Sequence, residues 1–180
     1  MTRRTAGAFG TTVFYHFLTT MNYAGRTLVL RRKTGAAPRM RPADRLPLWL
    51  AGDHYPCTLG SLGDYGPRMV TVDTGGIGIG LDTTVEIAER AGIEVDYDHP
   101  IQQPGGRLFP IRPERISLGT RVRRDMPGHA AENVFPGFPG PGQSAQFGFD
   151  LIANFTHEFF KPYAITFDYT AMCLFITAGE

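Results

Sequence analysis

MVTVDTGGIGIGLDTT, residues 69–84, ends a run of β-branched residues at an aspartate and then places four glycines within six positions. Two interpretations of this stretch compete. The glycines from Gly76 to Gly80 could cradle a phosphate group, with Asp73 incidental. Alternatively, Asp73 is the functional residue of this stretch, a catalytic acid held on a tight loop where a strand ends.

The phosphate-binding interpretation predicts a dinucleotide-binding domain. A strand over 69–72, the glycine run and a helix over 82–91 have the outline of a nucleotide-binding unit. Counted strictly, the G-x-G-x-x-G pattern fails, because its third glycine would fall on Leu81 or Thr83. The rest of the chain also lacks the alternation of strands with long helices that a doubly wound sheet requires. This alternative is the weaker of the two.

The composition is that of a globular domain without a strong charge. Of the 180 residues, 42% are hydrophobic and 19% are charged, and the formal net charge is +1. We therefore expect no nucleic-acid partner and no membrane partner. No apolar run approaches the roughly 20 residues of a membrane span. No clean signal peptide opens the sequence, so the localisation stays unknown.

The chain offers few residues for a cofactor. Cys57 and Cys173 could form one disulfide bridge if the fold brings them together. His54 and Cys57 are two potential metal ligands, but no second pair at ligand spacing follows. We therefore expect no metal and no other cofactor.

Short strands and many turns are the expected local structure, because 22 glycines and 14 prolines are spread along the chain. The clearest helix is 82–91, with Asp82 or Thr83 as its cap and Gly92 as its stop. A Pro- and Gly-rich stretch at 135–146 is expected to be a surface loop. The segments that read as strands are 27–30, 47–51, 69–72, 107–111, 115–118, 165–168 and 174–176.

The first thirty residues resemble the last thirty at an offset of 146. Over 7–30 and 153–176, five of twenty-four aligned positions are identical. The alternative is a chance likeness between two aromatic-rich, strand-forming segments. If the repeat is real, the chain contains one whole repeat and the tail of another. The identities pair Phe9, Phe14, Thr20, Tyr23 and Leu28 with Phe155, Phe160, Thr166, Tyr169 and Leu174.

The triplet Asp73-Thr74-Gly75 after an apolar strand resembles the active-site loop of aspartic proteases of the pepsin and retropepsin type. In that family the Asp activates a water, the Thr supports it through hydrogen bonds, and the Gly permits the tight turn. The segment LIANFTHEFFKPYAITFDYTAMCLFI at 151–176 is similar to the C-terminal part of small family members. The resemblance covers roughly residues 45–177. It departs from the family at Ala153, where glycine usually follows two apolar residues.

The resemblance implies a mainly antiparallel all-β lobe of retropepsin type, a β barrel with one or two short helices. The second helix is expected around 155–161. Asp73, Thr74 and Gly75 would be the catalytic residues. Gly105 and Gly106 would form the tip of a hairpin flap over the substrate, although a simple surface hairpin explains them as well.

The implied function is that of an aspartic-type endopeptidase lobe, which hydrolyses peptide bonds of a peptide or protein substrate through an Asp-activated water. This reaction needs two carboxylates that share a proton. The sequence contains one D-T-G and no D-S-G. A second aspartate must therefore come from a homodimer mate or from a missing lobe. A rival from another class is a non-catalytic member of the fold that binds peptide or protein.

The repeat favours the missing lobe. On this interpretation residues 1–33 are the C-terminal remnant of a preceding homologous lobe, residues 34–46 are a linker, and residues 47–178 are the complete lobe. An isolated hairpin is marginal in water. We therefore expect 1–33 to pair with the main sheet or with another copy of the chain.

Overall fold

The computed structural model describes residues 10–34, 41–42, 45–52, 54–76, 78–132 and 141–179. Within these ranges the chain is mostly β and mainly antiparallel, with four short helices, which confirms the expected all-β class. The helices are α1 (Thr11–Phe14), α2 (Val85–Arg90), α3 (Pro141–Phe147) and α4 (His157–Phe160). The strands are β1 (Phe17–Asn22), β2 (Thr27–Arg32), β3 (Arg45–Pro47), β4 (Trp49–Ala51), β5 (Tyr55–Leu62), β6 (Tyr65–Val72), β7 (Leu81–Thr84), β8 (Ile101–Gln103), β9 (Gly106–Ile111), β10 (Arg115–Leu118), β11 (Arg121–Arg124), β12 (Gly128–Glu132), β13 (Leu151–Phe155), β14 (Tyr163–Asp168) and β15 (Cys173–Ala178).

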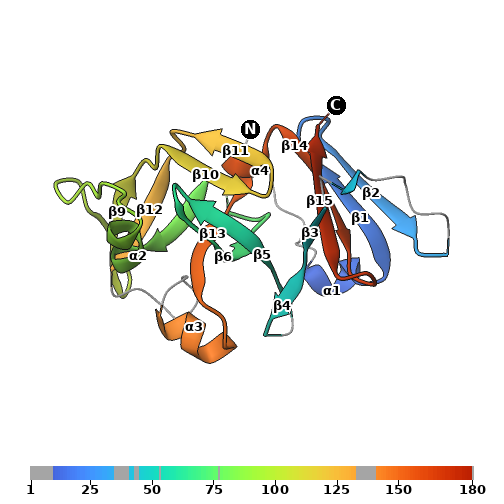
Figure 1. Cartoon of the computed structure of the whole chain (residues 1–180), viewed down its shortest axis with the longest axis horizontal. Coiled ribbons are helices and arrows are strands. Elements are labelled where there is room, and N and C mark those ends of the chain that lie inside the picture. Colours follow the sequence, from blue (N-terminus) through green and yellow to red (C-terminus); the bar gives the residue numbers. More distant parts are fainter. Residues whose placement is uncertain are drawn as a thin grey trace.

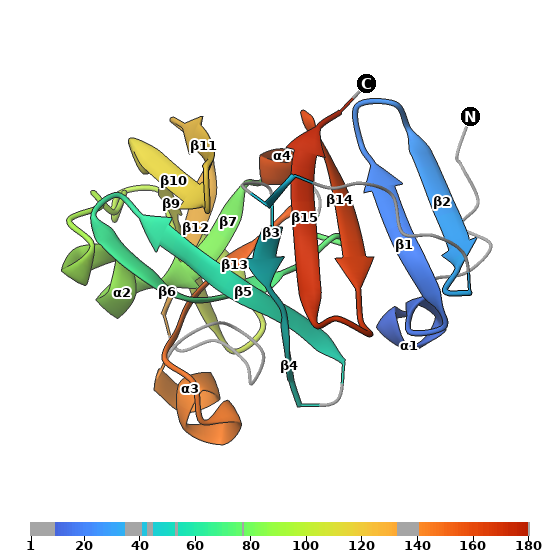
Figure 2. The same ribbon diagram turned by 45° about the vertical axis from the view of Figure 1, so that its right-hand side comes forward.

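Five strands form one sheet in the order β2-β1-β14-β15-β3, with every neighbouring pair antiparallel. Figure 2 shows β1 and β2 in blue beside β14 and β15 in red, so both ends of the chain share this sheet. The expectation that the N-terminal segment pairs with the main sheet is confirmed. Its partner strand is β14.

The second sheet has ten strands in the order β11-β10-β5-β6-β13-β7-β12-β9-β8, with β4 paired to β5 beside this path (Figure 1). Two pairings in it are parallel, β6 with β13 and β7 with β12. The order of described strands does not return to its first strand in either sheet. The expected β barrel is therefore not found in the described part of the chain.

The chain leaves the five-stranded sheet for the ten-stranded one at a single buried residue, Leu48, between β3 and β4, and returns through α4 between β13 and β14. Its N–H donates to the carbonyl of Met172 at 3.1 Å, and its side chain joins the main hydrophobic core. That core draws on both sheets, since it includes Val70 of β6 and Leu174 of β15. One continuous core therefore holds the two sheets together.

The helix expected at 82–91 is shorter than predicted. The first part of that range belongs to strand β7, and helix α2 begins at Val85 with Thr84 as its cap. The Thr84 hydroxyl accepts a hydrogen bond from the Ile87 N–H at 3.3 Å. The caps proposed at Asp82 and Thr83 were wrong, because these residues lie in β7, where parallel pairing with β12 overrides local helix propensity.

Two of the remaining helices were not expected, and one was. The stretch at 135–146 was predicted to be a loop, yet its described part lies in helix α3, where Pro141 takes a first position at which its missing N–H costs nothing. The short helix around 155–161 is found as α4, and α1 was missed. Most of the expected linker, residues 35–40 and 43–44, lies outside the described residues.

Elements at the two ends of the described chain match one another at the offset of the sequence repeat. The N-terminal unit (α1, β1 and β2) and the C-terminal unit (α4, β14 and β15) have elements of identical length, each displaced by 146 residues. In the N-terminal unit, Asn22 Oδ1 accepts from the Gly25 N–H at 2.9 Å. In the C-terminal unit, Asp168 Oδ1 accepts from the Ala171 N–H, again at 2.9 Å.

A local two-fold axis relates the two units. Strands β1 and β14 pair with Thr20 opposite Thr166, and the two hydroxyls lie 2.8 Å apart. The residue before Thr20 faces the residue after Thr166, and the reverse also holds. The hairpin turns agree as well, since Arg26 and its counterpart Met172 have φ of 52° and 47°. The axis therefore passes between Thr20 and Thr166.

Candidate functional site

Asp73 lies on the loop that directly follows strand β6. Its backbone N–H donates to the Phe155 carbonyl at 2.8 Å, which ties the loop to β13. Its Oδ1 accepts hydrogen bonds from the N–H groups of Gly75 at 2.8 Å and Gly76 at 3.1 Å. The turn that these two glycines make therefore fixes the orientation of the carboxylate.

Asn154 of β13 supplies a third hydrogen bond to this carboxylate. Its Nδ2 donates to Asp73 Oδ2 at 3.1 Å. Its Oδ1 accepts from the Thr71 hydroxyl at 2.7 Å. This second bond orients the amide so that its nitrogen faces Asp73. Sequence reasoning missed Asn154, although the residue directly follows the apolar run Leu151-Ile152-Ala153 in which the departure from the family lies.

Ala153, the expected departure from the family, is fully buried in β13. That strand lies between β6 and β7 in the sheet, so Ala153 is enclosed on both sides by neighbouring strands. Its pairing with Val70 follows a register shift after Leu151. The methyl group is thus accommodated within the core beside Asn154.

The glycine run packs against the start of helix α4. The N–H of His157 donates to the Gly76 carbonyl at 2.9 Å, and the N–H of Thr156 donates to the Gly80 carbonyl at 3.0 Å. A Cβ added to Gly76 would lie 2.9 Å from the Thr156 side chain. Close approach to α4 explains a glycine at this position.

This arrangement does not provide the phosphate cradle that the dinucleotide alternative required. The Gly76 N–H is bonded to Asp73, and the Gly80 N–H is bonded to the Pro127 carbonyl at 2.7 Å. The run continues into strand β7 rather than into a helix, and the first N–H groups of α4, which do face the run, are bonded to the carbonyls of Gly76 and Ile79. The strand–turn–helix outline inferred from the sequence was therefore wrong.

A cavity of about 320 Å³ adjoins the Asp73 loop. Its wall combines the β6 loop with residues of both terminal units. Asp73 is the one acidic side chain among the described residues that line it. The lining consists of Gly10, Thr11, Phe14, Met21, His54, Tyr55, Pro56, Thr71, Val72, Asp73, Thr74, Gly75, Asn154, Phe167 and Tyr169.

Tyr23 reaches across the two-fold axis to the same loop. Its hydroxyl donates to the Thr74 carbonyl at 3.5 Å, and its ring lies against His157 and Phe160 of α4. Burial raises the pKa of Tyr23 to about 12, against a lowering effect from hydrogen bonding with Thr74. The negative charge of Asp73 also raises this pKa. Apart from the repeat, no pattern in the sequence indicates this contact.

Gly105 and Gly106 lie where hairpin β8–β9 turns, with Gly105 at φ 94°. The expected hairpin is therefore present. Neither glycine is among the described residues that line the cavity beside Asp73. The structure thus does not bring this hairpin tip and the catalytic candidates together.

The two cysteines are buried free thiols, so the possible disulfide is not formed. Burial raises the pKa of Cys57 to about 11. The neighbouring His54 stacks on Tyr55, with ring centroids 4.2 Å apart. Across the described ranges, no group of three or more His, Cys, Asp or Glu side chains could hold a metal ion. None of the described helices is long and apolar enough to cross a membrane.

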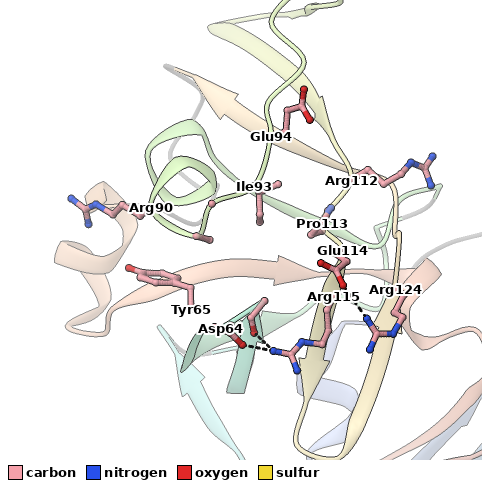
Figure 3. A pocket seen from close by; sticks show the side chains of 13 residues that line it. Asp64, Tyr65, Arg90, Ile93, Glu94, Arg112, Pro113, Glu114, Arg115 and Arg124 are labelled. Atoms are coloured by element: carbon pink, nitrogen blue, oxygen red, sulfur yellow. Dashed lines mark hydrogen bonds and ion pairs between the residues drawn. The ribbon is translucent and has the colours of Figure 1, made fainter.

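A larger hollow of about 800 Å³ lies beside α2 and the β10–β11 hairpin (Figure 3). Its arginines are engaged within the protein: Arg115 pairs with Asp64, and Arg124 with Glu114. The acidic partners of both pairs are largely exposed to solvent. Such exposed ion pairs contribute little stability, and we regard this hollow as solvated surface.

Comparison with known proteins gives a similarity in structure and none in sequence. Neither a family model nor a curated protein sequence matches the chain. The chain is similar to a solved structure of a retropepsin-like aspartic protease from Rickettsia conorii, with a TM-score of 0.49 and 14% sequence identity. The match covers 73% of this chain and 87% of that one. The chemistry proposed for the chain therefore rests on its own residues.

Proposed function

We propose that this chain is the lobe of an aspartic-type endopeptidase, in which Asp73 is one of two carboxylates that activate a water on a peptide substrate. Residues 47–178 would form the complete lobe, and residues 1–33 the remnant of a homologous one. The observation that carries this proposal is the Asp73 carboxylate, held by three hydrogen bonds at the wall of a cavity.

The hydrogen bonds to Asp73 suit such a role because they fix the position of the carboxylate before substrate binds. Two come from backbone N–H groups, which cannot rotate away, and the third comes from an amide whose orientation Thr71 sets. Catalytic groups held in advance in this way lose little entropy when the reaction begins. Thr74 and Gly75 complete the loop, and Tyr23 contacts it from the other unit.

The reaction requires a second carboxylate close to Asp73. One carboxylate removes a proton from the attacking water while the other, protonated, donates to the carbonyl oxygen of the scissile bond. Two such groups about 3 Å apart share one proton and titrate as a unit. The described lining of the cavity contains no second acid. The second aspartate would come from a dimer mate or from a missing lobe.

The lone acid also favours a second candidate, a non-catalytic lobe that binds peptide or protein in the same cavity. Asp73 would then be a charged recognition group. Such a protein would show neither peptide hydrolysis nor inhibition by pepstatin. A peptide-hydrolysis assay separates the two candidates.

Hydrolysis of a fluorogenic peptide library tests the proposal, with the chain alone and with a tandem polypeptide in which a second lobe precedes the chain. We expect cleavage at acidic to neutral pH that pepstatin blocks and that Asp73→Asn abolishes. Asp168→Asn is the matched control, because Asp168 also accepts two backbone N–H bonds in a turn but is not among the described residues that line the cavity. Equal cleavage by wild type and Asp73→Asn would exclude the protease assignment, and inactivity of both polypeptides would favour the binding lobe.

A further inference from the structure

The two terminal units are related by the axis at Thr20 and Thr166, yet they differ in how far they are covered. Val13, Leu28 and Leu30 of the N-terminal unit are 39%, 49% and 41% exposed. These are three of the large apolar residues that the described part of the chain leaves in contact with solvent. Each lies on an element that has a counterpart in the C-terminal unit.

The residues that the axis places in the same positions of the C-terminal unit are all buried. They are Phe159, Leu174 and Ile176, which are 0%, 0% and 1% exposed. All three belong to the main hydrophobic core, where they pack against side chains of the second sheet. The same surface of the same supersecondary unit is therefore a core contact at one end of the chain and a bare face at the other.

The edge of the five-stranded sheet shows the same difference. In the C-terminal unit, β15 is covered by β3, with Leu174 opposite Leu46. In the N-terminal unit, β2 is the last strand of the sheet, and no described strand pairs with its outer side. Figure 2 shows β2 at the end of the row of strands that runs from β3 through β15, β14 and β1. The bare face is thus continuous with the interface that already joins the two units.

From this asymmetry we propose that the face formed by Val13, Leu28, Leu30 and the outer edge of β2 is the docking surface for a second β lobe. That lobe would be built like residues 45–155 and would be supplied from outside these 180 residues, not by a second copy of them. Its apolar underside would cover the N-terminal unit as the second sheet covers the C-terminal unit.

A second copy of the chain cannot cover this surface with its lobe in the way that the second sheet covers the C-terminal unit. Each chain has two units that need covering but one lobe that can cover a unit. In that lobe the covering surface is already occupied by Phe159, Leu174 and Ile176. Any assembly of identical chains that used a lobe as the cover, including one that exchanges units, leaves one bare unit per chain. The surface therefore fits a lobe that carries no terminal unit of its own.

Docking of such a lobe would also complete the cavity beside Asp73, and this part of the inference rests on the proposed function. Tyr23 contacts the Asp73 loop at Thr74. The axis relates Tyr23 to Tyr169, which lines the cavity together with Thr11 and Phe14 of α1. The docked lobe would present its own loop to Tyr169, which would place the second carboxylate opposite Asp73.

The mass of the intact chain in solution gives the first test. We expect a monomer over a wide range of concentration, in wild type and in the double variant Leu28→Lys/Leu30→Lys alike. Val122→Lys is the matched control, because Val122 is an equally exposed apolar strand residue on β11, at the edge of the other sheet. A wild-type dimer that the double variant dissociates and Val122→Lys does not would overturn the proposal, since a second copy would then occupy the face.

A tandem polypeptide gives the second test. A copy of residues 45–152 is fused directly ahead of residue 7 of the chain, the register that the offset of 146 dictates. We expect amide hydrogen exchange at Thr27–Arg32 to slow by about ten-fold or more relative to the single chain, because β2 gains cover and a partner strand. Exchange at the single-chain rate, or an added segment that stays unfolded, would overturn the proposal. Protection without peptide hydrolysis would retain the docking surface and reject the protease function alone.

Discussion

The side-chain amide of Asn154 lies between the Thr71 hydroxyl and the Asp73 carboxylate, accepting from the first at 2.7 Å and donating to the second at 3.1 Å. Asn154→Asp should replace the hydrogen bond to Asp73 with electrostatic repulsion, because two carboxylates would then face each other. We expect a loss of roughly 1–3 kcal/mol in the free energy of unfolding at pH 7. This is the energy that corresponds to a rise of about one to two units in the pKa of the carboxyl pair.

The sign of the pH dependence distinguishes this repulsion from a packing defect. The folded protein would raise the pKa of the carboxyl pair, so the lost stability returns as pH falls through that raised pKa. Chemical denaturation at several pH values measures it. Thr71→Val is the control, since it removes a hydroxyl without adding charge and should cost about 1 kcal/mol at every pH. A pH-independent loss in Asn154→Asp would contradict the prediction.

Asp73→Asn should leave the fold intact whatever it does to turnover. The carbonyl oxygen of the new side chain can still accept from Gly75 and Gly76, and its amino group can donate to Asn154 once that amide flips. The flipped Asn154 retains Thr71 as a partner, since a hydroxyl both donates and accepts. We expect thermal unfolding within about 1 kcal/mol of wild type. A global loss of structure would show that the Asp73 charge is required for folding.

Gly76→Ala should destabilise the loop through a direct clash. The new methyl would lie 2.9 Å from the Thr156 side chain and 3.2 Å from Asp73 Oδ2. Overpacking of this kind costs about 1–3 kcal/mol. Gly75→Ala is the matched control, because its methyl would meet Asp73 Oδ1 alone, at 3.3 Å. Denaturant unfolding that ranks the two variants equally would be inconsistent with close packing of the loop on α4.

Tyr23→Phe should change the alkaline limb of the stability curve. Because burial raises the pKa of Tyr23 to about 12, the unfolded chain ionises this group near pH 10 while the folded chain keeps it neutral. Its contribution to stability is therefore complete below about pH 10 and is lost as pH rises towards 12. Removing the hydroxyl should flatten the fall over that window in denaturation measured against pH. An unchanged slope would show that Tyr23 is not the group responsible.

Local patterns predicted the parts of this fold that local chemistry determines. The segment 115–118 was placed as a strand with the bounds that β10 has, and the tight turn at Gly75 was expected from the resemblance that the contiguous triplet carries. Strand β12 was missed because GHAAE contains no β-branched residue and no Phe, Tyr or Trp. Its Ala130 and Ala131 are buried by pairing with β7 and β9, strands distant in sequence.

The same distinction separates what was found from what was missed at the candidate site. Asp73 could be identified because the Asp-Thr-Gly triplet is contiguous in sequence, and two of the three hydrogen-bond donors of Asp73 lie within three residues of it. Asn154 and Tyr23 could not, since each approaches the loop from a strand or turn far along the chain. The sequence repeat does align Tyr23 with Tyr169, at the offset of 146, and so marks both tyrosines as equivalent positions of the two units. The alignment of the two tyrosines does not indicate that Tyr23 is the one that contacts the Asp73 loop.

The pairing of Thr20 with Thr166 also governs the order in which this protein can assemble on the ribosome. The two residues are 146 positions apart, a separation that takes about 7–30 s to synthesise at typical rates of translation. During that interval the β1–β2 hairpin has emerged without its neighbour β14, and a lone hairpin is marginal in water. The five-stranded sheet therefore closes late in synthesis. Until then the β1–β2 hairpin is the segment that a chaperone would be expected to hold.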